Sequence, residues 1–595
     1  MPIDVNWTLM ATRRKKAAAN SNPASAPSTA DFAADRPAAA MASSDLDTRM
    51  KFRSPIILAL LVLVSLTPFL GKAFHIDDPL FVWTGKQIAQ HPGNPYGFTV
   101  TWYTEPEQMS DVTQNPPLAA YYIAAAGVIL GWSETALHGA FLVPALAMIL
   151  GTYFLARKFT RWPFVAGAAT LAAPGFLASS TSVMCDVMMV ALWVVAILFW
   201  LEGMERRRPA RLAISGVLIA LAALTKYFGM ALIPLLLLYS VARERRVGSW
   251  ILYLLLPVAA LAGYEFWTKA LYGRGLVQGA ADYAQSKNSL EFYKALVGLS
   301  FAGGCALPAL TFAPAIWSRR GLLWGGIAAG TAGLLVSIGA LNMPPAIAPY
   351  HRTALGLQLA LFVASGIGAL ALAFVDWRRN RDANSVLLLL WVLGTWVFAS
   401  FVNWTVNARS VLPMIPAIAI LLARRLEALG TLSGKARMAK LVAPLAASAV
   451  VALWVTWADA SLANSGRQAA QYVRDRLSKP GINVSFEGHW GFQYYMQAYQ
   501  YEPIDFRYFH VGDGNLVVIP QNSSYAEAQS IPANVVASRG VLALPVRAGI
   551  ITMSQAWGSG FYSDAIGPLP YSIGPSLSEY YMVLRLRNPD EKRQQ

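Results

Sequence analysis

Positive charge interrupts a largely apolar sequence in short clusters, and the spacing of these clusters constrains the fold more than any other feature. Arg and Lys residues gather within 156–161, 206–211, 243–246, 319–320, 378–381 and 424–440. Two apolar stretches, joined by a loop with fewer basic residues, separate each pair of neighbouring clusters. Because short basic loops remain on the cytoplasmic side of a membrane, the clusters predict the direction of every span. The pattern is typical of a polytopic membrane protein.

The overall composition supports this interpretation and limits the partners of the chain. Of the 595 residues, 55% are hydrophobic and only 13% are charged, whereas a soluble domain carries about 25% charged residues. The net charge of +16 is also found in proteins that bind nucleic acid. Here the charge lies mainly in the short inner loops and the N-terminal arm, so we expect contact with membrane lipid and no nucleic-acid partner.

The apolar segments are long enough to predict a count of spans, because a membrane-crossing helix needs about 20 apolar residues. The candidates are 54–71, 135–155, 163–181, 187–203, 211–226, 228–242, 249–268, 296–316, 321–341, 355–375, 384–402, 409–424 and 440–457. They predict about thirteen spans that begin on the cytoplasmic side and end on the outer side.

Residues 118–131 test this count. The segment is apolar but short, and it follows Pro116-Pro117. If it crossed the membrane, the basic cluster at 156–161 would move to the outer side. We therefore predict a juxtamembrane helix that lies along the outer interface, or enters the membrane and returns.

Three parts follow from this topology. Residues 1–53 are rich in Ala, Ser and Pro and predict a disordered cytoplasmic arm. Residues 54–457 form the membrane part, with a long first outer loop at 72–134. Residues 458–595 form an outer C-terminal domain. We see no internal repeat, so the inverted repeats of many transporters are absent from the sequence.

The C-terminal domain reads as a small α/β domain, because helical and strand patterns alternate between Gly and Pro residues. The expected elements are a helix at 465–477, a strand at 482–486, a helix at 489–499 and strands near 516–520 and 580–586. No disulfide framework stabilises the outer parts, since the two cysteines of the chain both lie in apolar segments.

Asp77 and Asp78 are the first candidates for chemistry, because they place an acidic pair directly after the first span. Adjacent carboxylates near lipid cost free energy unless a cation or a proton-donating substrate compensates them. One interpretation is a general base, or a carboxylate that holds an acceptor or a metal. The other is a helix N-cap, because Asp before Pro79 is a good helix start. The spacing does not decide between them.

Asp186 is the second acidic candidate and lies near the outer end of an apolar span. It also has a capping interpretation, but an acid within lipid indicates function more often than a cap. Two cations, Lys226 and Arg409, lie at outer helix ends, against the charge rule, and Arg352 is a weaker candidate for the same role. They either extend harmlessly to the interface or neutralise a phosphate.

The first outer loop also carries residues that could contact a sugar or an acceptor, namely Trp83, Tyr121 and Glu105. An ordinary aromatic belt at the membrane surface accounts for most aromatic residues of this loop. The histidines show no metal-ligand spacing, so the sequence predicts no certain cofactor. It neither indicates nor excludes a divalent metal at the acidic pair.

The order of these motifs resembles the GT-C glycosyltransferases that use polyprenyl-phosphate sugars, such as protein O-mannosyltransferases and lipid A aminoarabinose transferases. The matching elements are the acidic pair Asp77-Asp78, the segment 114–122 with Pro116-Pro117, Asp186, the motif Leu224-Thr225-Lys226 and Arg409 followed by Leu412-Pro413. The resemblance covers 54–457. It departs at Asp78, where relatives carry Glu, and at Asn115, where they often carry a basic residue.

The resemblance implies a GT-C-like membrane enzyme that transfers a hexosyl or pentosyl group from a polyprenyl-phosphate donor to an envelope acceptor hydroxyl, with inversion. Asp77 is then the expected base or acceptor-binding carboxylate, and Asp78 and Asp186 position acceptor or metal. Lys226 and Arg409, with Arg352 as a weaker candidate, hold the donor phosphate. The acceptor is a protein, lipid A or a polysaccharide.

The expected location is the inner membrane of a bacterium, with the N-terminus cytoplasmic and the C-terminal domain periplasmic. Two other functions remain open from the sequence. One is a transporter or lipid flippase, and the other is a non-catalytic envelope assembly protein. The sequence does not identify the sugar, the acceptor, the oligomeric state or the ligand of the C-terminal domain.

Overall fold

The computed structural model describes residues 53–587, apart from 104, 288–290, 292, 342, 344–350, 431–436, 505–513, 523–530 and 547. The predicted disordered arm lies outside the described residues, except for Arg53 at its end.

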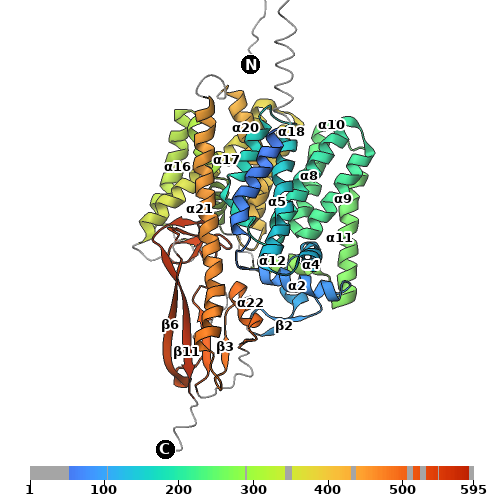
Figure 1. Cartoon of the computed structure of the whole chain (residues 1–595). Coiled ribbons are helices and arrows are strands. Elements are labelled where there is room, and N and C mark those ends of the chain that lie inside the picture. The colour runs from blue at the N-terminus through green and yellow to red at the C-terminus, as the bar shows by residue number, and fades with distance from the viewer. Residues whose placement is uncertain are drawn as a thin grey trace, which may run out of the picture. The chain divides into compact units, whose positions relative to one another are not determined.

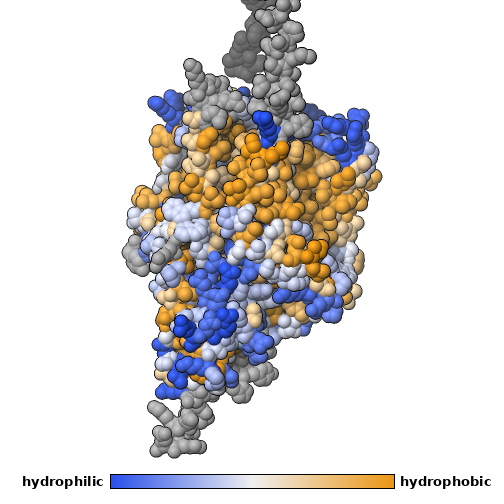
Figure 2. Space-filling model, viewed as in Figure 1, coloured by the Kyte–Doolittle hydropathy of each residue, from blue (hydrophilic) through white to orange (hydrophobic). Residues whose placement is uncertain are grey.

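Long apolar helices dominate the described chain (Figure 1). By length and composition, seven can cross a membrane: Glu134–Ala156 (α5), Cys185–Arg206 (α8), Tyr227–Glu244 (η2 and α10), Ile251–Tyr272 (α11), Arg352–Asn380 (α17), Ala383–Val402 (α18 and η4) and Ala439–Leu477 (most of α21, with η6). Hydrophobic side chains form a band over these helices on the face shown in Figure 2. The protein is therefore a multi-pass membrane protein, as predicted, although the count of about thirteen spans is not confirmed.

The other predicted spans are also helical, and most of them are shorter or interrupted. They comprise Arg53–Phe69, α6 (Pro163–Leu171) with α7 (Pro174–Ser179), α9 (Pro209–Thr225), α13 (Tyr293–Cys305) with α14 (Pro308–Thr311) and α15 (Ala313–Ile316), α16 (Arg319–Ser337), and α19 (Ala408–Val411) with η5 (Leu412–Met414) and α20 (Ile415–Ala428). Proline begins α6, α7, α9 and α14. Since proline lacks the N–H that continues a helix, these positions explain several interruptions.

The first outer loop contains two short helices, α2 (Asp78–Gln90) and α4 (Leu118–Leu130). With 13 residues, α4 is about 20 Å long, which is shorter than the hydrocarbon core of a bilayer. A short helix is thus present in the segment 118–131, as predicted, and it packs against α2. Between them lie β1 (Thr99–Thr101), β2 (Pro106–Gln108) and α3 (Met109–Val112).

The C-terminal region extends from the same end of the helical bundle where Figure 1 shows α2, α4 and α12 (Leu276–Lys287). Its five-stranded sheet has the order β4-β3-β5-β11-β6. The strands are β3 (Val484–Phe486), β4 (Glu502–Pro503), β5 (Leu516–Pro520), β6 (Val536–Val546) and β11 (Leu577–Leu586). β3 is parallel to β4 and β5, whereas β11 is antiparallel to β5 and β6.

The predicted strands and the helix at 489–499 correspond to β3, β5, β11 and α22 (Trp490–Ala498). Residues 465–477 are helical, as predicted, but they do not form a separate helix. They form the end of α21 (Arg437–Tyr472), which continues into the π-helical turn η6 (Val473–Leu477). The domain boundary expected between 457 and 458 therefore falls inside one continuous helix.

Large aromatic side chains fix α8 in the centre of the bundle. Trp193 and Trp200 are 2% and 0% exposed. The ring of Trp193 lies 6.1 Å from that of Trp391 in α18, and Trp200 Nε1–H donates to Ser240 Oγ at 2.9 Å. Burial of each aromatic side chain removes a large apolar area from water or lipid. The first turn of α8, with Asp186, is consequently held by a rigid helix.

A buried ion pair connects the start of the first outer loop to α21. Lys72 Nζ lies 2.6 Å from Asp459 Oδ2, and both side chains are 0% exposed. Lys72 also donates to Thr181 Oγ1 at 3.2 Å. Two buried charges must compensate each other, because an isolated charge in this environment is very costly.

We predict that Lys72→Met lowers the free energy of unfolding by about 3–5 kcal/mol, because it leaves the Asp459 carboxylate buried and unpaired. The double variant Lys72→Met/Asp459→Leu should recover part of this loss. Thermal unfolding of the full chain in detergent measures both effects. Lys158→Met is the control, since its partner Glu205 is partly exposed and loss of such a pair costs about 1 kcal/mol or less. Equal destabilisation by both single variants would contradict the prediction.

Candidate active site

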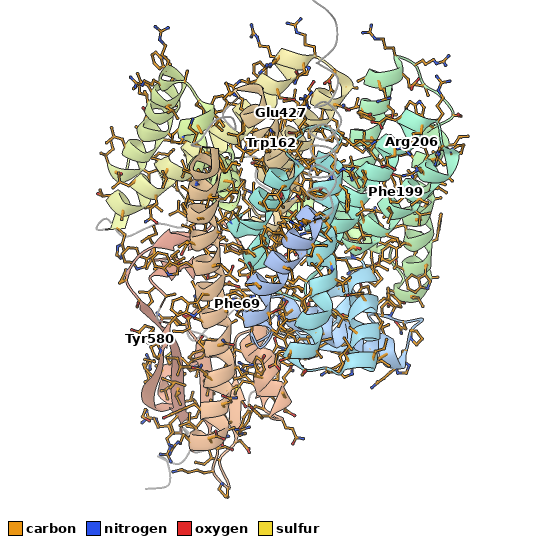
Figure 3. The ribbon with its side chains drawn as sticks, turned by 45° about the horizontal axis from the view of Figure 1, so that its top comes forward. Phe69, Trp162, Phe199, Arg206, Glu427 and Tyr580 are labelled. Atoms are coloured by element: carbon orange, nitrogen blue, oxygen red, sulfur yellow. The ribbon has the colours of Figure 1, made fainter. Side chains whose placement is uncertain are left out.

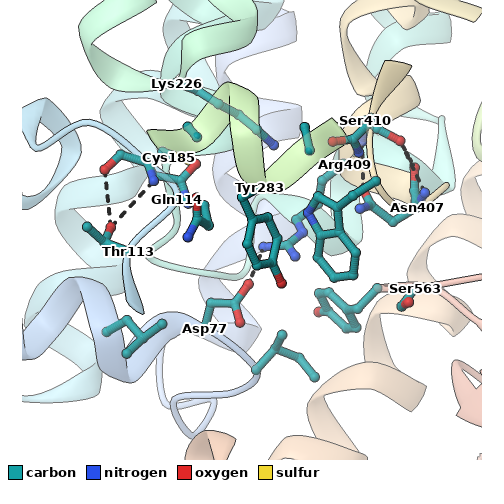
Figure 4. Close-up of a pocket in the computed structure, with 18 of the residues that line it drawn as sticks. Asp77, Thr113, Gln114, Cys185, Lys226, Tyr283, Asn407, Arg409, Ser410 and Ser563 are labelled. Carbon is teal, nitrogen blue, oxygen red and sulfur yellow. Dashed lines mark hydrogen bonds and ion pairs between the residues drawn. The ribbon is translucent and has the colours of Figure 1, made fainter. Parts of the chain in front are cut away.

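A cavity of about 1010 Å³ lies where the first outer loop, α8, the membrane helices and the C-terminal region meet. Its charged lining residues are Asp77, Lys226 and Arg409. Figure 4 shows Arg409 paired with Asp77 across this cavity, with Lys226 pointing into the same space. The volume is at the upper end of the range of about 300–1,000 Å³ that is usual for small-molecule sites.

Two acids and two cations form one connected group at the cavity. Lys226 Nζ lies 2.5 Å from Asp186 Oδ1, and Arg409 Nη1 lies 3.0 Å from Asp77 Oδ2. Arg409 Nη1 is also 3.9 Å from Asp186 Oδ2, which connects the two pairs. The structure thus brings together Asp77, Asp186, Lys226 and Arg409, which lie far apart in the sequence.

The burial of these residues differs in a way that separates their possible roles. The Asp186 side chain is only 3% exposed, whereas the Lys226 side chain is 24% exposed. Asp77 is 30% exposed and its partner Arg409 14%. Asp186 lies behind both cations, and Asp77 faces the cavity with them.

Local structure explains how Lys226 and Arg409 reach the site. Lys226 has extended backbone angles between α9 and the 3-10 helix η2, so the chain turns there. Arg409 lies in α19, a short helix that begins with a capping box. In this box Asn407 Oδ1 accepts from the Ser410 N–H at 2.8 Å. The capping box holds the turn that carries Arg409.

The capping interpretation of Asp77 and Asp186 does not describe their contacts. Asp77 occupies the N-cap position of α2 but makes no side-chain capping hydrogen bond. The N-cap of α8 is Met184, also without a side-chain cap, and Asp186 lies inside the first turn. Both carboxylates instead pair with cations.

Asp78 points away from the cavity and organises the loop. Its side chain is fully buried and accepts from the His75 N–H and the Val183 N–H, each at 2.9 Å. It therefore joins the first outer loop to the turn that precedes α8. Burial raises the pKa of Asp78 from 3.8 to about 7, although nearby Lys72 and these two hydrogen bonds act in the opposite direction.

The motif at Pro116-Pro117 also reaches the cavity. Gln114, Asn115 and Pro116 line it, and the Asn115 carbonyl accepts from Tyr96 O–H at 2.8 Å. A basic residue in place of Asn115 would add charge at this wall. With Asn115 present, the cations that line the cavity in the described chain are Lys226 and Arg409.

Four predicted residues lie outside the described lining of the cavity: Arg352, Trp83, Tyr121 and Glu105. Arg352 begins α17. The Trp83 ring packs at 6.3 Å against that of Trp102, which does line the cavity. Glu105 is exposed. The predicted roles of these four residues in phosphate or acceptor binding stay predictions.

No group of three or more His, Cys, Asp and Glu side chains in the described part of the chain could hold a metal ion. The charges around Asp186 and Asp77 are compensated by Lys226 and Arg409. The arrangement therefore offers cations for an anionic ligand and one carboxylate for a proton.

The C-terminal region contributes lining residues that the sequence patterns did not indicate. They are Gln521, Asn522, Met553, Gln555, Tyr562, Ser563, Ala565 and Ile566. A second missed element is Asp459, which pairs with Lys72. The available signal was weak, namely a Lys and an Asp directly after the first and last apolar runs.

Residues 114–266 match the profile of the family described as dolichyl-phosphate-mannose-protein mannosyltransferase. The matched segment begins at the Gln114-Asn115-Pro116-Pro117 motif and includes Asp186 and Lys226. This match confirms the predicted resemblance to protein O-mannosyltransferases over residues 114–266. No curated protein sequence matches the chain significantly.

Several solved structures also show similarity to this chain. The oligosaccharyltransferase of Archaeoglobus fulgidus is 16% identical with a TM-score of 0.46, and the match covers 76% of this chain and 63% of that one. ArnT of Cupriavidus metallidurans, bound to undecaprenyl phosphate, is 15% identical with a TM-score of 0.41, covering 82% and 96%. The mycobacterial arabinofuranosyltransferase AftD is 14% identical with a TM-score of 0.36, covering 91% and 40%.

The raised pKa of Asp78 predicts a pH dependence of stability. A carboxyl that binds its proton more tightly in the folded state stabilises the fold below its unfolded pKa, and this contribution is lost as the pH rises through about 7. We expect the thermal midpoint of the wild type to fall more between pH 5 and pH 8 than that of Asp78→Asn. The comparison removes contributions from other groups, such as His75, whose pKa burial lowers to about 4. Parallel pH profiles for the two proteins would contradict this assignment.

Proposed function

We propose that the protein is a membrane glycosyltransferase that moves a sugar from a polyprenyl-phosphate donor to an acceptor hydroxyl. The observation that carries this proposal is the pairing of Lys226 and Arg409 with Asp186 and Asp77 at one cavity. The match to a family of transferases that use a lipid-phosphate sugar supports the same reaction class.

In this proposal the two cations bind the phosphate of the donor. Lys226 and Arg409 both line the cavity, and guanidinium and ammonium groups form strong charge-assisted hydrogen bonds to phosphate oxygens. As the bond between the sugar and the phosphate breaks, negative charge grows on the phosphate. Cations that are already in place stabilise this charge without reorganisation. Asp186, buried behind them, holds both cations in position.

Asp77 serves as the general base. It is the only carboxylate among the described residues that line the cavity. The acceptor oxygen attacks the anomeric carbon, its proton passes to Asp77, and the carbon–oxygen bond to the phosphate breaks. A single displacement of this kind inverts the configuration at the anomeric carbon.

The remaining lining fits an acceptor that presents hydroxyl groups. Carboxamide side chains contribute to the cavity wall: Gln114, Asn115, Asn403, Asn407, Gln521, Asn522 and Gln555. A carboxamide can donate and accept hydrogen bonds, as a sugar hydroxyl also does. The rings of Trp102, Tyr283 and Trp404 add apolar faces to the same wall. Polysaccharide, lipid A and hydroxyl-bearing side chains of proteins remain the acceptor classes to compare.

We further propose that the cavity faces the periplasm of a bacterial inner membrane. Arg206 and Glu427 lie at the end of the bundle opposite Tyr580 of the C-terminal region (Figure 3). The basic clusters that include Arg206 and Arg425 predict a cytoplasmic location for that end.

The central prediction concerns Asp77, Lys226 and Arg409. We expect Asp77→Asn to reduce sugar transfer by about 10²–10⁴-fold, because it removes the base, while binding of undecaprenyl phosphate is retained. Lys226→Met and Arg409→Met should weaken that binding at least tenfold, since each removes a charge-assisted contact. The assay uses purified protein, labelled polyprenyl-phosphate sugars and envelope acceptors.

Asp111→Asn is the matched control, because Asp111 also forms an ion pair with an arginine, Arg274, in the same outer region. Both side chains of that pair are about half exposed, at 50% and 46%. Undiminished transfer by a well-folded Asp77→Asn protein would remove the proposed base. Movement of the labelled lipid across vesicles without covalent transfer would favour the transporter.

The proposed orientation of the protein in the membrane can be tested with alkaline phosphatase fusions. Alkaline phosphatase fused after Thr160 or Arg245 should be inactive, because these positions lie in basic loops that are predicted to be cytoplasmic. A fusion after Ser563 should be active. Phosphatase activity at either of the first two sites would overturn the proposed orientation.

A further inference from the structure

We propose that Tyr562 is a positioning residue for Arg409, so that the C-terminal segment completes the phosphate-binding part of the site. This proposal rests on the proposed function. It differs from the expected arrangement, in which residues 458–595 form a separate outer domain beside a complete membrane enzyme.

The first observation is that the C-terminal segment pairs with the chain directly before Arg409. The Ala408 N–H donates to the Phe561 carbonyl at 2.9 Å, and the Asp564 N–H donates to the Val406 carbonyl at 2.9 Å. Thr405 Oγ1–H donates to Asp564 Oδ1 at 2.6 Å. Residues 405–408 and 561–564 are therefore joined by two backbone hydrogen bonds and one side-chain hydrogen bond.

The second observation is the position of the Tyr562 ring under the guanidinium. Arg409 Cζ lies 5.6 Å from the ring centre, within the distance of about 6 Å at which a cation is attracted to an aromatic face. Tyr562 also lines the cavity. The guanidinium lies over this ring, while Arg409 Nη1 points to Asp77.

The third observation is that the ring is itself fixed from behind. Tyr562 O–H donates to Asp459 Oδ2 at 2.8 Å, and the same carboxylate pairs with Lys72 at 2.6 Å. Burial, and then the charge of Asp459, raises the pKa of Tyr562 well above its usual value, so the hydroxyl keeps its proton and remains a donor. The ring thus cannot rotate away without breaking a buried hydrogen bond.

These contacts leave Arg409 prepared for a ligand. Arg409 Nε is buried, and no described residue accepts a hydrogen bond from it. Arg409 Nη1 reaches both Asp77 and Asp186. A guanidinium that lies over a fixed ring and has an unused donor can turn its edge to a phosphate with little loss of side-chain entropy. Without the ring, Arg409 would have more rotamers to lose on binding.

The test compares two substitutions of Tyr562 in the full chain, reconstituted in lipid nanodiscs, with undecaprenyl phosphate as the probe. Tyr562→Phe keeps the ring and loses the hydrogen bond to Asp459, so we expect a lower thermal midpoint but an affinity within about twofold of the wild type. Tyr562→Leu loses the ring, and we expect an affinity lower by about 5- to 30-fold. If Tyr562 had only a structural role, the affinity for undecaprenyl phosphate would instead fall together with the thermal midpoint in both variants.

Tyr571 provides the matched control. It is also a buried C-terminal tyrosine, its O–H donates to the Gly304 carbonyl at 3.1 Å, and its ring packs on Phe362. Tyr571→Leu should lower the thermal midpoint and leave the affinity unchanged. Wild-type affinity in a folded Tyr562→Leu protein, or equal losses in the two leucine variants, would overturn the proposal. If neither the wild type nor Arg409→Met binds the probe, the proposed function fails instead.

Discussion

Charge compensation around Arg409 is the constraint on which the rest of the site depends. Arg409 contacts Asp77 and Asp186, and Asp186 in turn holds Lys226. In partly buried surroundings each charge would be costly alone, and removal of one partner leaves another uncompensated. The first outer loop, the start of α8, the turn after α9 and α19 must therefore meet at one place. This requirement explains why several turns lie together beside otherwise regular helices.

The scaffold around these charges is built from buried polar contacts between distant segments. Asp78 joins the first outer loop to the turn before α8 through two backbone N–H groups, and Lys72 joins the same loop to α21 through Asp459. Tyr562 then connects Asp459 to Arg409. Each contact satisfies a polar group that would otherwise be buried without a partner. A network of this kind specifies one arrangement of loops more strictly than apolar packing does.

The sequence predicts the membrane class, the helical segments and the four charged residues that meet at the candidate site. It can do so because a lipid environment restricts both the length of apolar segments and the positions of charged side chains. Apolar length identifies spans, and an acid or a cation at an outer helix end, as for Asp186 and Lys226, departs from those restrictions. The sequence does not predict the role of Asp78, because Asp77 and Asp78 are adjacent residues of the same type. Only the folded backbone directs the Asp77 side chain to Arg409 and the Asp78 side chain to the His75 N–H. The sequence also does not predict the contact of Tyr562 with Arg409, because a contact between residues so far apart in the chain produces no periodic pattern in either segment. The long helix α21 crosses the expected domain boundary for a related reason: polarity changes at residue 458 while helix propensity does not.

The balance of charge suggests how binding and chemistry are coupled in the proposed reaction. Arg409 Nη1 lies 3.0 Å from Asp77 Oδ2, so the guanidinium occupies one oxygen of the carboxylate that is proposed as the base. A donor phosphate that takes contacts from Arg409 and Lys226 reduces the positive charge available to Asp77. The Asp77 oxygen that Arg409 contacts then becomes available to the acceptor hydroxyl. Hydrolysis of an incompletely bound donor is thereby disfavoured, because the base is released only when the leaving group has its cations. The fixed ring of Tyr562 supports this exchange, because it keeps the Arg409 guanidinium at the cavity, within reach of both Asp77 and the donor phosphate.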